Sequence, residues 1–205
     1  MPGAPAPAFE VRPAAGDADL RAILALQASQ LAAALGPEAA ARDGFVTVRH
    51  DLETLRRMHA LAPSVVAVAT GPAGGAGEDP GALAGYALVM PVEAAPWVPV
   101  LAPMFELLRG LAFRGRPLAS LRHYVMGQVC VAPAWRGRGV FDALYAGHRR
   151  LLADRYDVCV TEISLRNGRS LRAHARVGFE TIHRYRDATD DWAVVALPLG
   201  QGGGT

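Results

Sequence analysis

The chain has 205 residues, enough for one domain with a substantial core or two very small ones, and 51% of them are hydrophobic and 20% charged, as in globular proteins. The formal net charge of +2 is too small to require a nucleic acid or an anionic membrane as partner. No lysine occurs, so all 21 lysine-or-arginine positions are arginine. This excludes a Schiff-base lysine, a pyridoxal phosphate anchor and the lysine of a P-loop.

The sequence favours a cytoplasmic protein with reduced thiols. Residues 1–8 are rich in proline and alanine and lack the basic and apolar segments of a secretory signal. Apolar stretches are short and interrupted by proline, so no membrane span is expected. Cys130 and Cys159 lie in apolar runs, and we expect both to be buried free thiols rather than a disulfide. No metal is expected, because the following histidines lack metal-ligand spacing: His50, His59, His123, His148 and His183.

The N-terminal half predicts helices between short strands. Its expected elements are loose residues at 1–8, a strand at 9–12, a helix that follows Asp17 or Asp19 and ends at Gly36-Pro37, a helix at 52–61 and a buried strand at 64–70. Residues 71–81, rich in glycine and proline, are expected to form the flexible tip of a hairpin. A helical stretch at about 98–111 is expected to cover part of the core or of a substrate pocket.

The last third alternates strands and helices. The expected elements are strands at 123–131 and 157–165, helices at 139–152 and 167–177, two closing strands at 179–185 and 192–197, and a loose end at 200–205. Two strands joined through a helix imply parallel pairing by a right-handed crossover. The polar turn between the closing strands implies an antiparallel edge. The chain is thus expected to be one mixed α/β domain over residues 9–199.

One turn carries most of the chemical information. A buried strand ends at Pro133, residues 136–139 read Arg-Gly-Arg-Gly, and an apolar helix begins at Val140. Glycines allow a tight turn with exposed N–H groups, and the new helix directs its unpaired donors and positive dipole end to the same place. This predicts a site for an anion such as a diphosphate. The alternative is a solvated basic loop that caps a helix. A dinucleotide-binding glycine motif fits poorly, because the third glycine is absent.

A second motif follows one helix and one strand later. Glu162 lies within a strand, Asn167 opens a helix, and Gly178-Phe179 closes it. Together the two motifs resemble those of the GNAT superfamily of acyl-CoA-dependent N-acyltransferases, of bacterial type, whose Arg/Gln-x-x-Gly-x-Gly/Ala turn holds the coenzyme pyrophosphate. Here Phe141 stands where the final small residue usually lies, which reduces the room near the phosphates.

The resemblance implies a fold, a co-substrate and its binding residues. The fold is a mostly antiparallel twisted sheet of about seven strands, with a V-shaped split between two central parallel strands and helices on both sides. The co-substrate is acetyl-CoA. The residues implied to bind it are Val129, Cys130, Val131, Arg136, Gly137, Arg138, Gly139, Val140, Phe141, Asn167 and Ser170. For Asn167 and Ser170, a role in N-capping is the alternative.

Two residues are candidates for proton transfer. Resemblance to the ribosomal-protein alanine N-acetyltransferases implies that Glu162 deprotonates the amine, directly or through water; a structural salt bridge is the alternative. His174 stands where most family members have a tyrosine that protonates the departing thiolate, which an imidazole could also do. The alternative is a histidine satisfied by a backbone carbonyl. Cys130 is an unfavourable nucleophile, because its apolar neighbours should raise the pKa of its thiol.

The expected activity is direct transfer of an acetyl group from acetyl-CoA to a primary amine, carried by a small molecule or by a protein N-terminus. Two alternatives remain: a non-catalytic acyl-CoA-binding module, and a polyanion-binding strip of arginines. A solvated helix face is the simpler explanation of that strip, which contains Arg166, Arg169, Arg172 and Arg176. Edge strands near the C-terminus suggest a homodimer.

Overall fold

The computed structural model describes residues 8–71 and 79–200 and contains one seven-stranded sheet in the order β1-β2-β3-β6-β7-β9-β8. The expected loose ends and the tip of the predicted hairpin therefore lie largely outside the described residues. Among the strands of this sheet, as far as the structure describes them, only β6 and β7 pair in parallel. The predicted mixed, mostly antiparallel architecture is confirmed. The strands are β1 (Phe9–Pro13), β2 (Val65–Ala69), β3 (Leu83–Pro91), β6 (His123–Val131), β7 (Val158–Ser164), β8 (Glu180–Arg186) and β9 (Asp191–Pro198).

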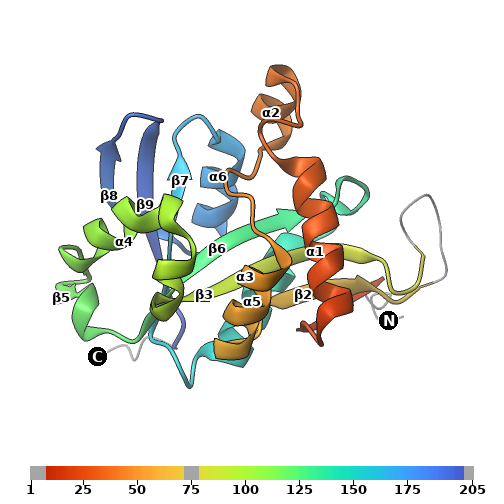
Figure 1. Ribbon diagram of the computed structural model, residues 1–205, viewed down its shortest axis with the longest axis horizontal. Helices are drawn as coiled ribbons and strands as arrows, with labels where there is room; N and C mark the ends of the chain where they lie inside the picture. The colour runs from red at the N-terminus through yellow and green to blue at the C-terminus, as the bar shows by residue number, and fades with distance from the viewer. Residues whose placement is uncertain (1–7, 72–78, 201–205) are drawn as a thin grey trace, which may run out of the picture.

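Helices cover both faces of this sheet (Figure 1). They are α1 (Asp17–Gln30), α2 (Pro37–Asp43), α3 (Leu52–Leu61), α4 (Ala102–Arg109), α5 (Val140–Leu152) and α6 (Gly168–Arg176). The buried side chains of α1, α3 and α4 form one hydrophobic core, and those of α5 form a second core on the opposite face. Strand β3 contributes side chains to both cores, because Leu88 and Met90 point into the first core and Val89 into the second.

The two parallel strands separate soon after they meet. Their pairing covers only three residues of each strand and ends at Val125 opposite Val160. The Thr161 hydroxyl then donates a hydrogen bond to the carbonyl of Met126 at 3.0 Å. On the other side of β6, the pairing with β3 shifts around Gly127, which marks a bulge. The backbone of β6 beyond Gly127 therefore faces a gap on its β7 side.

The segment between β3 and β6 differs from the single helix that was predicted. Prolines limit it to two 3₁₀ turns, at Val92–Trp97 and Pro99–Leu101, before the shorter helix α4. A small hairpin of β4 (Ala112–Phe113) and β5 (Arg116–Pro117), which the sequence did not indicate, follows. Buried side chains of α4 cover part of the core, which was one of the two roles predicted for this stretch, the other being to cover a substrate pocket.

Helix α2 was not predicted, because the Gly36-Pro37 pair was interpreted as a stop. Helix α1 ends at Gln30, and Pro37 instead occupies the first turn of α2, where its missing N–H is harmless. Figure 1 shows α2 standing beside α6 at one end of the sheet. Strand β8 forms the C-terminal edge of the sheet, and dimerisation through it stays a prediction. Among the residues that the structure describes, no helix combines the length and apolar character needed to cross a bilayer.

Close packing of α5 on the sheet depends on Gly147. A Cβ atom there would lie 2.7 Å from a methyl carbon of Val11 and 3.3 Å from one of Val65. We predict that Gly147→Val lowers the free energy of unfolding by about 1–3 kcal/mol through overpacking. The control Ala146→Val, at an exposed position of the same helix, should cost only about 0.5 kcal/mol. Urea denaturation measures both, and equal losses would contradict the packing account.

Candidate functional site

The gap between β6 and β7 opens into a cavity of about 580 Å³, which we call the main cavity. Its walls come from the end of β6, the turn before α5 and the first residues of that helix, α6 along its whole length, and the segment that follows α2. It is lined by all of the predicted coenzyme-binding residues except Arg138, whose guanidinium instead lies 5.2 Å from the ring centre of Trp135. Residues far apart in sequence thus meet at one cavity.

The glycine turn has the conformation that an anion site needs. Gly137 and Gly139 have φ angles of 75° and 80°, a left-handed region that side chains disfavour. Helix α5 begins at Val140, and no side chain caps it. The N–H groups of its first turn therefore lack helical partners and are available to a ligand. Phe141, the departure from the family pattern, packs its ring 5.0 Å from Tyr145 and 5.1 Å from His174.

Arg136 is positioned at this turn by two side chains from the N-terminal half. Its guanidinium donates to the side-chain carbonyl of Gln30 at 2.6 Å and lies 3.4 Å from the carboxylate of Asp43. Its side chain is only 19% exposed. Gln30 and Asp43 also line the main cavity. Neither was among the binding residues predicted from the sequence, because only the tertiary fold brings them there.

A second, smaller cavity of about 80 Å³ adjoins the main one and shares Asn167 and Ser170 with it. Glu162 of β7 and Trp192 of β9 line it. Glu162 accepts a hydrogen bond from the hydroxyl of Tyr185, a partner on β8 that the sequence analysis did not identify. Within residues 8–71 and 79–200, Glu162 forms no ion pair, so the structure does not support the alternative role of a structural salt bridge.

Burial raises the pKa of Glu162 above that of an ordinary glutamate, and the Tyr185 hydrogen bond partly opposes this shift. The pKa of Tyr185 is raised as well, mainly by desolvation and then by its bond to Glu162. Glu162 is thus a half-buried carboxylate with one hydroxyl partner at the wall of a cavity. Such a group suits proton transfer near neutral pH better than an exposed carboxylate does.

His174 lines the smaller cavity, and its hydrogen bonds favour the alternative role over that of an acid. Its Nδ1 atom lies 2.8 Å from the carbonyl of Ser170, and its Nε2 atom lies 2.8 Å from the hydroxyl of Tyr145. The ring is almost fully buried, which lowers its pKa to about 4. His174 is therefore neutral at physiological pH, with Nδ1 donating and Nε2 accepting. This geometry fits the alternative role, a histidine satisfied by a backbone carbonyl.

Asn167 links the two cavities to the N-terminal half of the chain. Its side-chain oxygen accepts from the N–H of Ser170 at 3.1 Å and caps α6, and its amide donates to the carbonyl of Phe45 at 3.1 Å. Asn167, not Ser170, is therefore the capping residue. Contacts of Asn167 and Ser170 with a coenzyme remain predictions.

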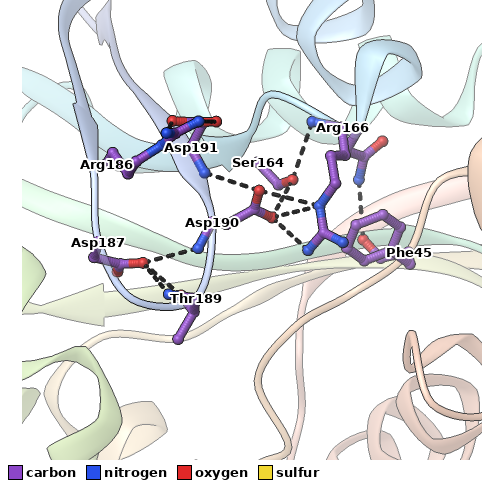
Figure 2. Close-up of polar contacts among 9 residues, drawn as sticks. Phe45, Ser164, Arg166, Arg186, Asp187, Thr189, Asp190 and Asp191 are labelled. Atoms are coloured by element: carbon purple, nitrogen blue, oxygen red, sulfur yellow. Dashed lines mark hydrogen bonds and ion pairs between the residues drawn. The ribbon is translucent and has the colours of Figure 1, made fainter.

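The turn between β8 and β9 is fixed to the end of β7 by Asp190 (Figure 2). The Asp190 carboxylate accepts from the Ser164 hydroxyl at 2.6 Å and from the Arg166 guanidinium at 2.7 Å. Two further arginines of the predicted strip are also paired, Arg169 with Asp43 and Arg176 with Asp142. These ion pairs favour a solvated, charge-balanced face over a polyanion-binding strip.

No protein-family model matches the chain, and no curated protein matches it in sequence. Solved structures resemble it in fold. The ribosomal-protein-S18-alanine N-acetyltransferase from Escherichia coli is 13% identical, with a TM-score of 0.58 over 95% of this chain and 96% of that enzyme. NAA60 from Arabidopsis thaliana, solved with acetyl-CoA, is 14% identical, with a TM-score of 0.56 over 93% of this chain and 99% of that one.

A GNAT superfamily phosphinothricin acetyltransferase from Sinorhizobium meliloti, solved with acetyl-CoA, is 20% identical, with a TM-score of 0.56 over 97% of this chain and 92% of that enzyme. At these identities the likeness establishes the fold. The chain has the fold of the GNAT acetyltransferases, as the two sequence motifs implied.

The two cysteines should be chemically inert in the native protein. Burial raises the pKa of Cys130 and of Cys159 to about 12, although Cys130 lies at the wall of the main cavity. Since only the thiolate reacts, we predict that iodoacetamide at pH 8 modifies the native protein at least 100-fold more slowly than the urea-unfolded protein. Mass spectrometry over time measures both rates. Rapid modification of native Cys130 would contradict this result and revive covalent catalysis.

Proposed function

We propose that the chain is an N-acetyltransferase that moves an acetyl group from acetyl-CoA to a primary amine by direct attack. The observation that carries this proposal is the separation of β6 from β7 over a glycine turn at a helix N-terminus. An extended co-substrate with an anionic end needs an open strand edge for its arm and unpaired N–H donors for its phosphates. Both are found in one cavity.

The residues present fit such a co-substrate. The backbone N–H groups at residues 137–141 would hold the diphosphate, with Arg136 adding a charge-assisted contact. The free backbone of β6 at residues 129–131 would pair with the pantetheine arm and direct an N–H group at the thioester oxygen. When bound, acetyl-CoA supplies an activated acyl group that an amine attacks directly.

Glu162 is proposed to be the general base. The smaller cavity is proposed to take the acceptor amine, and we call it the acceptor cavity. Amines are protonated near neutral pH, so a group at this cavity must take a proton before or during attack. Glu162 has this position, since it lines the smaller cavity and its pKa is raised. Tyr185 is proposed to position Glu162, because its hydroxyl holds one carboxylate oxygen and leaves the other for the amine or a water molecule.

Departure of the thiol does not depend on His174 in this scheme. An alkyl thiol has a pKa of about 8.5, so the expelled thiolate is a moderately stable leaving group. The proton can then come from solvent. The buried His174 and its partner Tyr145 instead support α6 from the inside.

The acceptor is proposed to be either a small-molecule amine or a protein N-terminus. The solved structures of the same fold include an enzyme named for an alanine of ribosomal protein S18 and one named for phosphinothricin. An assay of CoA release with acetyl-CoA should therefore screen both small amines and short peptides. CoA release that depends on one acceptor would support the proposal. Tight acetyl-CoA binding with no turnover for any acceptor would instead favour the non-catalytic binding module.

Replacing the proposed base should affect catalysis rather than binding. We predict that Glu162→Gln lowers kcat at least 100-fold, while the dissociation constant for acetyl-CoA changes less than threefold. In the wild type, kcat/KM should rise with pH as Glu162 loses its proton. Tyr185→Phe removes a hydrogen bond that lowers the Glu162 pKa, so this rise should move to higher pH.

Glu180→Gln serves as the matched control, since it makes the same change at an exposed position of β8. It should leave kcat within about twofold. Stopped-time assays of CoA release from pH 5 to 9 measure all three variants. An unchanged kcat in Glu162→Gln, or an acidic limb that does not move in Tyr185→Phe, would reject these roles.

A further inference from the structure

Asp43 joins the two walls of the main cavity. It is the last residue of α2, and its carboxylate oxygens lie 3.4 Å from the guanidinium of Arg136 and 3.6 Å from that of Arg169. Arg136 immediately precedes the glycine turn, whereas Arg169 belongs to the first turn of α6. The two arginines therefore come from opposite sides of the cavity, and a carboxylate from a third element bridges them.

This carboxylate is ionised and mostly covered. Its side chain is 21% exposed, and hydrogen bonds from the neighbouring Arg42 lower its pKa, with further help from Arg136 and Arg169. Asp43 thus shares one negative charge among Arg42, at 2.8 Å, and the two cations at the main cavity, Arg136 and Arg169. The phosphate groups of the proposed co-substrate would draw on the same cations, since Arg136 adjoins the glycine turn and Arg169 lines the same cavity.

We propose that Asp43 is an internal counter-ion that competes with the phosphate groups of the coenzyme for Arg136 and Arg169. This inference rests on the proposed function of the main cavity. A carboxylate within a few ångströms of a bound phosphate repels it, and it also occupies donors that the phosphate could use. The wild-type affinity for the coenzyme is therefore lower than the glycine turn and the arginines alone would give.

The residues that follow Asp43 lead from the main cavity to the acceptor cavity. Gly44, next to Asp43, has a φ angle of 76°, and a Cβ atom there would lie 3.0 Å from the side-chain oxygen of Asn167. Phe45 and Val46 then line both cavities. Asp43 is thus continuous in sequence with a segment that lines both cavities.

The test compares Asp43→Asn with Glu38→Gln, which removes one negative charge from an exposed position of the same helix. Calorimetric titration with acetyl-CoA at low salt should show three- to tenfold tighter binding for Asp43→Asn and less than twofold change for Glu38→Gln. Acetyl-pantetheine, which lacks all phosphates, should bind the three proteins alike. Circular dichroism confirms that each variant is folded, and Asp43→Ala provides a second replacement.

Unchanged or weaker binding of acetyl-CoA by both Asp43 variants would overturn the proposal. Equal gains in Glu38→Gln, or an equal gain for acetyl-pantetheine, would also overturn it, because the effect would then not be local competition with phosphate. If the wild type binds no acetyl-CoA, the proposed function fails. Titration with inorganic pyrophosphate then still tests whether Asp43 competes with phosphate groups. Tighter pyrophosphate binding by Asp43→Asn than by Glu38→Gln supports competition, and equal binding rejects it.

Discussion

The site depends on the point at which β6 and β7 stop pairing. Backbone N–H and C=O groups in a sheet normally satisfy one another, so two strands that separate must find other partners for them. Here the Thr161 hydroxyl satisfies the Met126 carbonyl at the point of separation, and a bulge at Gly127 bends the opposite edge of β6. Beyond that point the β6 edge is open. The smaller cavity lies between it and β7, and the main cavity adjoins the end of β6 at residues 129–131.

The residues proposed to bind acetyl-CoA and to take the proton of the amine lie around this opening. The parallel connection through α5 places the start of that helix at the end of β6, so its free N–H groups lie beside the open strand edge. Strand β7 carries Glu162 away from β6 toward β9 and β8, where Tyr185 meets it. The proposed anion site at the start of α5 and the proposed base on β7 are thereby held on different elements.

The sequence predicted those parts of the site that depend only on residues close together in the chain. The strand, glycine turn and helix around Gly139 need only residues within a short stretch, and the sequence placed them correctly. The missed parts depend on contacts between distant residues. Tyr185 reaches Glu162 across 23 residues, Tyr145 reaches His174 across 29, and Asn167 reaches Phe45 across 122. The partner of His174 could not be predicted for the same reason, since Tyr145 lies on another helix.

The central claim is that acetyl-CoA lies in the split between β6 and β7 with its diphosphate at the glycine turn. A titration of isotopically labelled protein with acetyl-CoA, followed by amide NMR shifts, tests it most directly. The account predicts saturable shifts that are largest for the amides at residues 129–131 and 137–141, the open edge of β6 and the start of α5. Saturable shifts confined to other segments, or none in these two at millimolar acetyl-CoA, would contradict it.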